Sequence, residues 1–388
     1  MKPRDRSLVN LRGDFGLVDR RTRPEPCPMN FRMISALVLL LTALGRLTQA
    51  ASIGTIAGTG ERGYSGDGGP ALKARLDNPF GAIRGADGAI WFCEYSNHVV
   101  RRIAADGVVD TIVGNGRAGY AGDGGPAIAA AMNQPHEIRF DRDGNLFIAD
   151  MRNHAIRRWD AKSKRLAAFA GNGQQGYSGD GGPAANAQFK QPHSLQFAPD
   201  GDLFVCDTGN HVVRRIDART GFIETFAGIG KAGPTPDGSP IKGTPLNGPR
   251  SLDFDRDGNL WLATREGNQV FKFNLKTGRI QHIAGTGKKG FTGNSGPAKD
   301  ATLSGPKGIA VAPNGDVYLC DTESHSIRRI KTGTGILDLV AGTGVAGNGP
   351  DGDPLACKLA RPHGVFVEAD GSVLIGDSEN HRVRVLRP

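Results

Sequence analysis

Apolar and polar residues alternate in short stretches along most of this chain, with a period of two residues. Between 137 and 170 the pattern divides into four such stretches, at about 137–140, 145–149, 154–159 and 165–170. An Asp-Gly pair separates the first two stretches, and an Ala-Gly pair closes the fourth. Alternation of this kind is typical of β-strands, and Asp-Gly between alternating stretches favours a hairpin. We therefore predict four antiparallel strands, called a to d, in this segment.

The same four-strand sequence pattern occurs six times. A landmark residue between strands b and c, in most copies His, marks each copy. It falls at His98, His154, His211, Gln269, His325 and His381, in steps of 56, 57, 58, 56 and 56 residues. A regular period with four short strands is typical of a propeller, and the 3.6-residue period of a helical solenoid is not visible. The sequence predicts an all-β, six-bladed β-propeller with four-stranded blades.

The two ends of the repeated region are complementary. Residues 52–58 have the pattern of a strand d, whereas residues 381–386 have the pattern of a strand c. We therefore expect the first strand to complete the last blade. Such pairing joins the two ends and removes free sheet edges.

Residues 1–50 differ from the rest of the chain. Residues 1–28 are polar and rich in Pro and Arg, an apolar run follows at 33–44, and small residues stand at 48–50. This order is typical of a secretory signal cleaved before Ala51, with translation starting at Met29 or Met33. The apolar run is shorter than the about 20 residues of a membrane span, which leaves an uncleaved anchor as the alternative. We predict a leader over 1–50, a single propeller domain over 51–388, and a periplasmic or secreted protein.

The net charge of +9 is partly a property of that leader. Nine of the 48 basic and four of the 39 acidic residues lie within 1–50, which leaves a net charge of +4 for the remainder. A mild excess on a domain of this size does not indicate a nucleic-acid partner. We expect a monomer that does not bind nucleic acid and meets a membrane only through an uncleaved leader.

Three motifs carry a family resemblance. Asn97-His98, Asn210-His211 and Asn380-His381 stand at the landmark turns. They resemble NHL repeats, and the resemblance covers about 52–388. The Gly-Tyr-Ser-Gly-Asp-Gly-Gly-Pro-Ala text at 63–71 and 176–184 is similar to bacterial extracytoplasmic members. The resemblance implies a propeller, commonly six-bladed, whose functions include sensing, RNA binding, adhesion and one amidating lyase, so the fold transfers better than the function.

One position differs in chemistry between the repeats. The residue after the Pro that opens strand a should lie near one mouth of the central channel. Around the six blades this residue is Phe80, His136, His193, Arg250, Lys307 and His363. Such a ring offers cationic groups to an anion. The alternative is a purely structural role, in which His after Pro is simply common at this position of the repeat.

The three histidines of this ring also suggest a metal. Three imidazoles can hold Zn²⁺ with one position open for water or substrate. The peptidyl-amidating lyase of the family binds zinc through channel histidines, so the resemblance implies His136, His193 and His363 as ligands. It also implies Arg250 as a group that steadies a substrate carboxylate. The histidines fall in blades two, three and six, and that enzyme's catalytic Tyr has no match here.

Other recurring residues are better explained by the blade. We expect the landmark His to form hydrogen bonds between neighbouring repeats, and the Asp and Asn before it to bind turn amides. The Arg pairs of strand c, such as Arg157-Arg158, are expected to form ion pairs between blades. Cys93, Cys206 and Cys320 read as small buried residues. Blade four departs most, with Thr264 for Asp and Phe271-Lys272-Phe273 for Val-Arg-Arg.

Two functions follow from the ring. The first is a scaffold that binds a peptide, a glycan or a small anionic ligand at the channel mouth. The alternative is a metal-dependent lyase or hydrolase that uses the histidines. A structural role with a protein partner on the outer blades is the third possibility.

Overall fold

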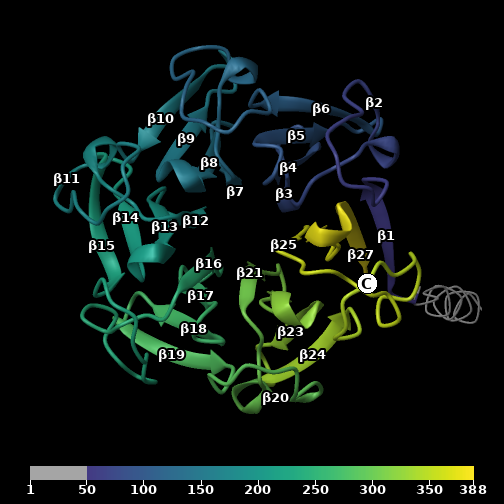
Figure 1. Ribbon diagram of the computed structural model, residues 1–388. Coiled ribbons are helices and arrows are strands. Elements are labelled where there is room, and N and C mark those ends of the chain that lie inside the picture. Colours follow the sequence, from purple (N-terminus) through teal and green to yellow (C-terminus); the bar gives the residue numbers. More distant parts are fainter. Residues whose placement is uncertain (1–49) are drawn as a thin grey trace, which may run out of the picture. The chain divides into compact units, whose positions relative to one another are not determined.

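The computed structural model describes residues 50–388, and these residues form six β-sheets around a central channel (Figure 1). All of the predicted leader (1–50) except its last residue lies outside the described residues. Within 50–388 no α-helix is present, and no helix is long and apolar enough to cross a membrane. The fold prediction of an all-β, six-bladed propeller is confirmed.

Each blade places strand a at the channel and strand d at the outside. Blade one contains β3 (Pro79–Arg84), β4 (Ile90–Glu94), β5 (Val99–Ile103), β6 (Val108–Val113) and the short edge strand β2 (Gly69–Pro70). Blade two contains β7 (Pro135–Phe140), β8 (Leu146–Asp150), β9 (Ala155–Trp159) and β10 (Leu166–Ala170). Blade three contains β12 (Pro192–Phe197), β13 (Leu203–Asp207), β14 (Val212–Ile216), β15 (Phe222–Gly228) and the edge strand β11 (Gly182–Pro183).

The other three blades have the same order. Blade four contains β16 (Pro249–Phe254), β17 (Leu260–Thr264), β18 (Gln269–Asn274) and β19 (Arg279–Ala284). Blade five contains β21 (Pro306–Val311), β22 (Val317–Asp321), β23 (Ser326–Lys331), β24 (Ile336–Ala341) and the edge strand β20 (Gly296–Pro297). Blade six contains β25 (Gly364–Val367), β26 (Val373–Asp377), β27 (Arg382–Arg387) and, from the other end of the chain, β1 (Ser52–Ala57).

Short 3₁₀ helices occur at two places in the repeat. Four follow the Pro of the connection between blades: η1 (Ala71–Lys73), η2 (Ala127–Ala129), η4 (Ala184–Asn186) and η6 (Ala298–Asp300). Four form the b–c turn: η3 (Met151–Asn153), η5 (Thr208–Asn210), η7 (Thr322–Ser324) and η8 (Ser378–Asn380).

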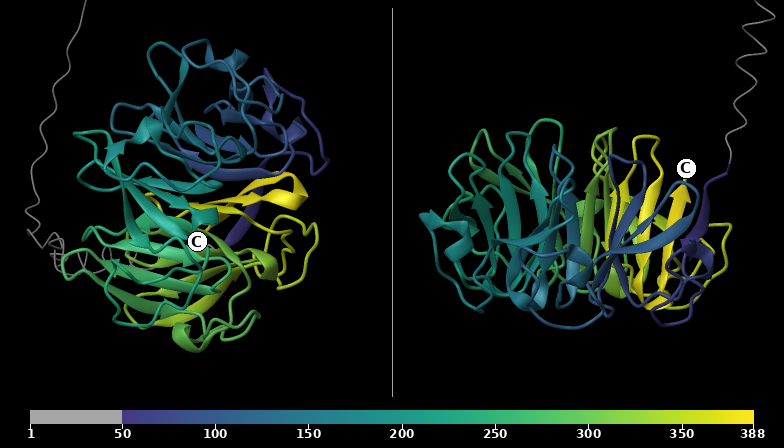
Figure 2. Two further views of the ribbon diagram at one scale, coloured as in Figure 1. Left: turned by 60° about the vertical axis from the view of Figure 1, so that its left-hand side comes forward. Right: turned by 90° about the horizontal axis from the view of Figure 1, so that it is seen from above.

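The closure of the ring follows the prediction. β1 pairs antiparallel with β27, with Ser52 opposite Arg387 and Thr55 opposite Arg384. Figure 2 shows β1 lying beside the last strands of the chain. A hydrophobic cluster that includes Ala57, Val383 and Phe92 then packs blade six against blade one. Closure therefore gives blade six the same four strands, a to d, that the other blades contain.

The hydrophobic core is divided among the blade interfaces. Six clusters of buried side chains each join two neighbouring blades. In the first cluster, Trp91 and Cys93 of blade one pack with Ile138 and Trp159 of blade two. The four Cys within the described residues are buried and free, as expected for small core residues. Each blade therefore depends on its neighbours for burial, as repeat architectures do.

The landmark residues join neighbouring blades by hydrogen bonds. His154 lies in the left-handed region with a φ of 53°, and its Nδ1 accepts the backbone N–H of Gln191 over 3.2 Å. The same contact recurs from Asn78, Gln134, Gly248 and Arg361 to His381, His98, His211 and His325. The expectation that the landmark His joins the repeats is confirmed.

Blade four corrects the alignment of the repeat by one residue. The landmark there is Asn268, not Gln269, because Asn268 has a φ of 50° and its Oδ1 accepts the N–H of Gly305 over 2.8 Å. The amide oxygen replaces imidazole Nδ1 as the acceptor. The shift also means that Phe271 and Lys272, opposite Leu262 and Trp261, stand where other blades have the Arg pair.

The first Arg of each pair is buried inside its own blade. Arg101, Arg157, Arg214, Arg328 and Arg384 have no exposed surface. Arg157 lies 3.2 Å from Asp150 of the neighbouring strand and 2.7 Å from Asp123 of the preceding connection. The partners in the other blades are Glu94, Asp207, Asp321 and Asp377, with Asp67, Asp180 and Asp351 in the connections. The prediction of ion pairs between blades is therefore wrong, because these pairs fasten each connection to the blade that it enters.

Candidate functional site

The six residues after the opening Pro converge on one cavity. Its volume is about 540 Å³. Its lining includes Phe80, His136, His193, Arg250, Lys307 and His363. All six side chains are buried, with between 4% and 8% of their surface exposed. The structure thus brings together every residue of the ring that the sequence singled out.

The entry of strand a explains this position. Gln134, just before the Pro of β7, has a φ of 57° and gives its N–H to His98 of the preceding blade. The ladder between β7 and β8 is irregular between Pro135 and Ile138, so His136 and Glu137 leave regular pairing. Pro itself has no N–H to donate, which suits the first residue of an edge strand. The repeat therefore directs one side chain per blade into the mouth.

Two cations of the ring are hydrogen-bonded to imidazoles. Arg250 Nη2 donates to His136 Nε2 over 2.7 Å, and Lys307 Nζ donates to His363 Nε2 over 3.2 Å. The Nδ1–H of His363 donates to the carbonyl of Arg361 over 2.8 Å. Guanidinium and ammonium groups only donate, so both Nε2 atoms carry lone pairs and both rings are neutral.

Burial keeps all three imidazoles neutral. It lowers the pKa of His136 and His363 well below the usual value, and the charges of Arg250 and Lys307 lower both further. For His193, burial and then Arg250 have the same effect on the pKa. Within the ring of six residues, the positive charge therefore belongs to Arg250 and Lys307 and not to the histidines.

Lys307 has a carboxylate partner. Its Nζ lies 2.8 Å from Glu323, which also binds Arg361 over 2.8 Å. Burial, followed by the charge of Arg250, lowers the pKa of Lys307 to about 7, against the opposite effect of Glu323. Burial raises the pKa of Glu323, but hydrogen bonds from Arg361 and Lys307 bring it down to about 2. This carboxylate is thus ionised near neutral pH.

Arg250 has no such partner. Among residues 50–388 no carboxylate oxygen lies within ion-pair distance of its guanidinium, and its buried Nε has no hydrogen-bond partner. Burial and the nearby Arg265 lower its pKa to about 9, against the opposite effect of the more distant Glu266, and this value still leaves it protonated at neutral pH. A buried charge without a counter-charge is costly, whereas a carboxylate or phosphate matches the guanidinium with two parallel hydrogen bonds.

Aromatic rings form the opposite part of the mouth. Phe80 stacks on His363 with ring centroids 4.1 Å apart and an interplanar angle of 15°. Tyr95 lies 4.8 Å from Phe80, and its hydroxyl donates to Gln134 over 2.8 Å. The cavity therefore offers an apolar aromatic surface beside a charged one.

Sequence reasoning missed a second layer of the mouth. The b–c turns contribute Tyr95, Arg152, Arg265, Glu266 and Glu379 to the lining, and Arg361 comes from the connection before strand a. The sequence does contain a signal for this layer, in the two residues between the recurring Asp and Asn of each b–c turn. These two differ in type from blade to blade, as the ring does.

Below the ring the channel narrows. A second cavity of about 10 Å³ is lined by residues that include Glu137, Arg139 and Ser251. Arg139 pairs with Glu137, and Gln196 donates to Asp253 over 2.8 Å. A space of this size holds about one water molecule. The mouth is therefore a pocket with a polar floor.

The long connections do not present free ligands to this pocket. Tyr64 donates to or accepts from Thr111 over 2.9 Å, and Asp67 pairs with Arg101. The guanidinium of Arg157 lies over the ring of Tyr120, and that of Arg214 lies over the ring of Tyr177. These contacts hold the loop side chains against the blades.

The three histidines do not fit a zinc site in this arrangement. Within the described part of the chain, no group of three or more His, Cys, Asp or Glu side chains has metal-binding geometry. The Nε2 atoms of His136 and His363 face Arg250 and Lys307, which would repel a cation. Zinc binding stays a prediction, and elemental analysis of protein purified without chelator tests it.

Comparison with known proteins identifies the type of repeat. The NHL repeat family model matches residues 303–330 and 359–386, in blades five and six. NHL repeat-containing protein 2 from Bos taurus is 28% identical over 293 residues, covering 66% of this chain and 38% of its own length. Protein SUPPRESSOR OF QUENCHING 1, chloroplastic, from Arabidopsis thaliana is 28% identical over 267 residues, or 66% of this chain and 25% of that protein. The chain thus spans well under half the length of these curated relatives.

Solved structures agree on the fold. An auxiliary nutrient binding protein from Bacteroides ovatus superposes with a TM-score of 0.64 and 16% identity, covering 87% of this chain and 77% of that one. A protein from Bacteroides thetaiotaomicron with the same description gives a TM-score of 0.63 and 16% identity, over 87% of this chain and 76% of its own. At such identities the likeness shows the fold alone. The chain therefore carries NHL repeats on a six-bladed β-propeller.

Proposed function

We propose that this protein is a binding scaffold that holds a small anionic ligand, or the anionic group of a peptide or glycan, at the channel mouth. Arg250 carries the proposal, because its buried guanidinium faces the cavity without a carboxylate partner among the described residues. A ligand carboxylate or phosphate would supply the missing counter-charge. Lys307 adds an ammonium to the lining of the same cavity, and this group also holds Glu323.

The other residues of the mouth assist this binding. The neutral rings of His136 and His363 hold Arg250 and Lys307 in place without cancelling their charges. Phe80 and Tyr95 offer an apolar surface to the body of the ligand. The Bacteroides neighbours described as nutrient-binding proteins support a binding role, and with the predicted signal they support a location outside the cytoplasm. No reacting group is required for this function.

Thermal unfolding with a panel of anions tests the proposal. The panel comprises inorganic phosphate, acetate, succinate, glucuronate and a dipeptide with a free carboxylate. We expect at least one anion to raise the midpoint of the wild type and to have no such effect on Arg250→Met. Arg256→Met is the matched control, because Arg256 lies in the exposed turn after β16. Equal stabilisation of both variants by every active anion would contradict the role of Arg250.

A further inference from the structure

The grooves between neighbouring blades are not all filled alike. In each groove an aromatic or large apolar residue of strand b meets a residue near the end of strand d. Between blades two and three, Phe169 of β10 packs edge-on against Phe147, with centroids 4.8 Å apart. Between blades three and four, Phe226 packs against Phe204 over 4.9 Å in the same way. A strand-d Phe therefore fills these two grooves.

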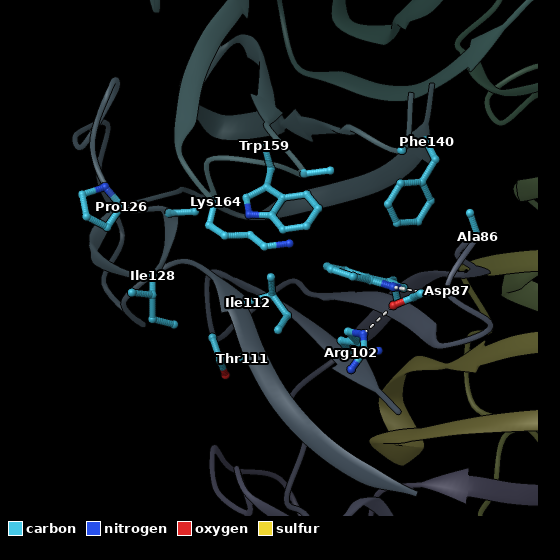
Figure 3. Close-up of a pocket in the computed structure, with 14 residues that line it drawn as sticks. Ala86, Asp87, Arg102, Thr111, Ile112, Pro126, Ile128, Phe140, Trp159 and Lys164 are labelled. Carbon is cyan, nitrogen blue, oxygen red and sulfur yellow. Dashed lines mark hydrogen bonds and ion pairs between the residues drawn. The ribbon is translucent and has the colours of Figure 1, made fainter. Parts of the chain in front are cut away.

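In the other four grooves, including the one between blades one and two, the strand-d residue is a smaller aliphatic one: Ile112, Ile283, Val340 or Ile56. Ile112 of β6 stands where β10 and β15 carry Phe, and a cavity of about 610 Å³ opens beside it. Figure 3 shows the cavity between Ile112 and Ile128 on one side and Trp159 and Phe140 on the other. Side chains of this kind make the walls largely apolar. The volume lies within the range of ordinary small-molecule sites.

Two of the chain's three Trp residues line this one cavity. The rings of Trp91 and Trp159 have centroids 5.3 Å apart, and Phe140 meets Trp91 edge-on over 5.4 Å. Flat rings of this size provide stacking surfaces for another flat ring. Ile128 adds an exposed apolar side chain at the rim, with 51% of its surface exposed.

Two polar groups of this cavity, the buried Trp159 Nε1–H and the ammonium of the exposed Lys164, make no hydrogen bond or ion pair with a side chain of residues 50–388. The Trp159 Nε1–H is buried and has no hydrogen-bond acceptor within residues 50–388. Lys164 lies beneath the Trp159 ring with its Nζ 4.7 Å from the ring centroid, and its ammonium is directed into the cavity (Figure 3). In the described chain no carboxylate lies within ion-pair distance of Lys164, whereas Arg102 across the cavity is bound to Asp87 over 2.7 Å.

We propose that this cavity is a second binding site, which takes a small aromatic anion. Its ring lies between Ile112, Phe140 and the Trp pair. Its anionic group binds the ammonium of Lys164, and movement of the Lys164 stem lets the Trp159 Nε1–H donate to it. The ammonium fixes the sign of the charge, and the rings fix the flat apolar body. This site lies between two blades and shares no residue with the channel mouth, so it is independent of the function proposed there.

The chain itself provides the variant that closes the cavity. Ile112→Phe places in β6 the residue that fills the next two grooves. Ile112→Leu keeps the volume and serves as its control. Val340→Phe is the matched control in another groove, because Val340 lines a separate cavity of about 770 Å³ between blades five and six. Unchanged thermal unfolding shows that each variant is folded.

Titration with anilinonaphthalene sulfonate, followed by its fluorescence, tests the site. We expect wild type, Ile112→Leu and Val340→Phe to bind this aromatic anion equally, and Ile112→Phe to bind it at least about tenfold more weakly. Lys164→Met should weaken the sulfonate by up to about fivefold, as loss of an exposed ion pair does. The uncharged analogue phenylnaphthylamine should be insensitive to Lys164→Met.

Two results would overturn the assignment. Equal affinity of wild type and Ile112→Phe would show that the dye binds elsewhere. An equal effect of Lys164→Met on the charged and the uncharged probe would show that the cavity does not recognise an anion. Arg250→Met must leave both titrations unchanged, which separates this site from the mouth.

Discussion

The molecule buries arginine in two different settings. Arg157 and its four equivalents lie inside the blades, fully buried, and each is paired with a carboxylate of the same blade. All but Arg328 are also paired with a carboxylate of the connection. Arg250 lies at the channel mouth with 8% of its surface exposed, and its neighbour is the neutral His136. The first setting satisfies the charge within the fold. The second leaves the charge available to something from outside.

Blade four shows that the ion pairs inside the blades serve structure. There Phe271 replaces the buried Arg and Thr264 replaces the Asp, so both charges are absent together. Phe271 is buried and packs with His282 over 5.7 Å. Exchange of a whole buried ion pair for apolar groups is often neutral, whereas loss of one partner is costly. The mouth shows the opposite pattern, a single charge kept without its partner.

The largest effect is expected from breaking a pair inside a blade. Arg157→Met leaves the buried carboxylate of Asp150 without its cation, and we expect a loss of about 3–5 kcal/mol in the free energy of unfolding. Urea denaturation at pH 7 measures it. Adding Asp150→Thr to copy blade four should restore part of the loss, and a double variant no more stable than the single one would contradict the comparison.

A smaller effect is expected at the loop end of the same cluster. Asp123 accepts from Arg157 but is itself 37% exposed, so water screens its charge. Asp123→Asn keeps one acceptor, and we expect a loss of about 1 kcal/mol in the same urea assay. A loss as large as that of Arg157→Met would mean that the connection, and not the blade, holds the arginine.

Anion binding at the mouth should depend on pH. The pKa of Lys307 is about 7 in the folded protein, and its unfolded value is near 10.5. A bound anion favours the charged amine, so anion affinity should fall as pH rises through about 7. The unfolded chain holds more protons between these two values, so this group makes the unliganded fold more stable as pH rises across that range.

Titration of an active anion between pH 6 and 8, below the pKa of about 9 of Arg250, measures this dependence. Lys307→Met should remove it and lower the affinity to that of the wild type at high pH. A slope that persists in Lys307→Met would assign the titration to another group.

The fold could be predicted from the repeat, but the partners of the charged side chains could not. The period, the Asp-Gly turns and the complementary ends predicted six blades and their closure, because each of these features can be recognised in a short stretch of sequence. The ring was also predictable, since strand a places one residue per blade at the mouth. The contact of Arg250 with His136, which lies 114 residues away, depends on side chains that meet across the channel. Gln269 was misassigned because Asn and His both accept at the landmark position.

Unfolding of unliganded Arg250→Met tests the central claim most directly. If the guanidinium is kept for a ligand, removing its uncompensated charge should leave the free energy of unfolding within about 1 kcal/mol of wild type or raise it, because no buried carboxylate is orphaned. A loss of about 3 kcal/mol or more, comparable with that of Arg157→Met, would show that Arg250 is a structural residue like the arginines of the blades.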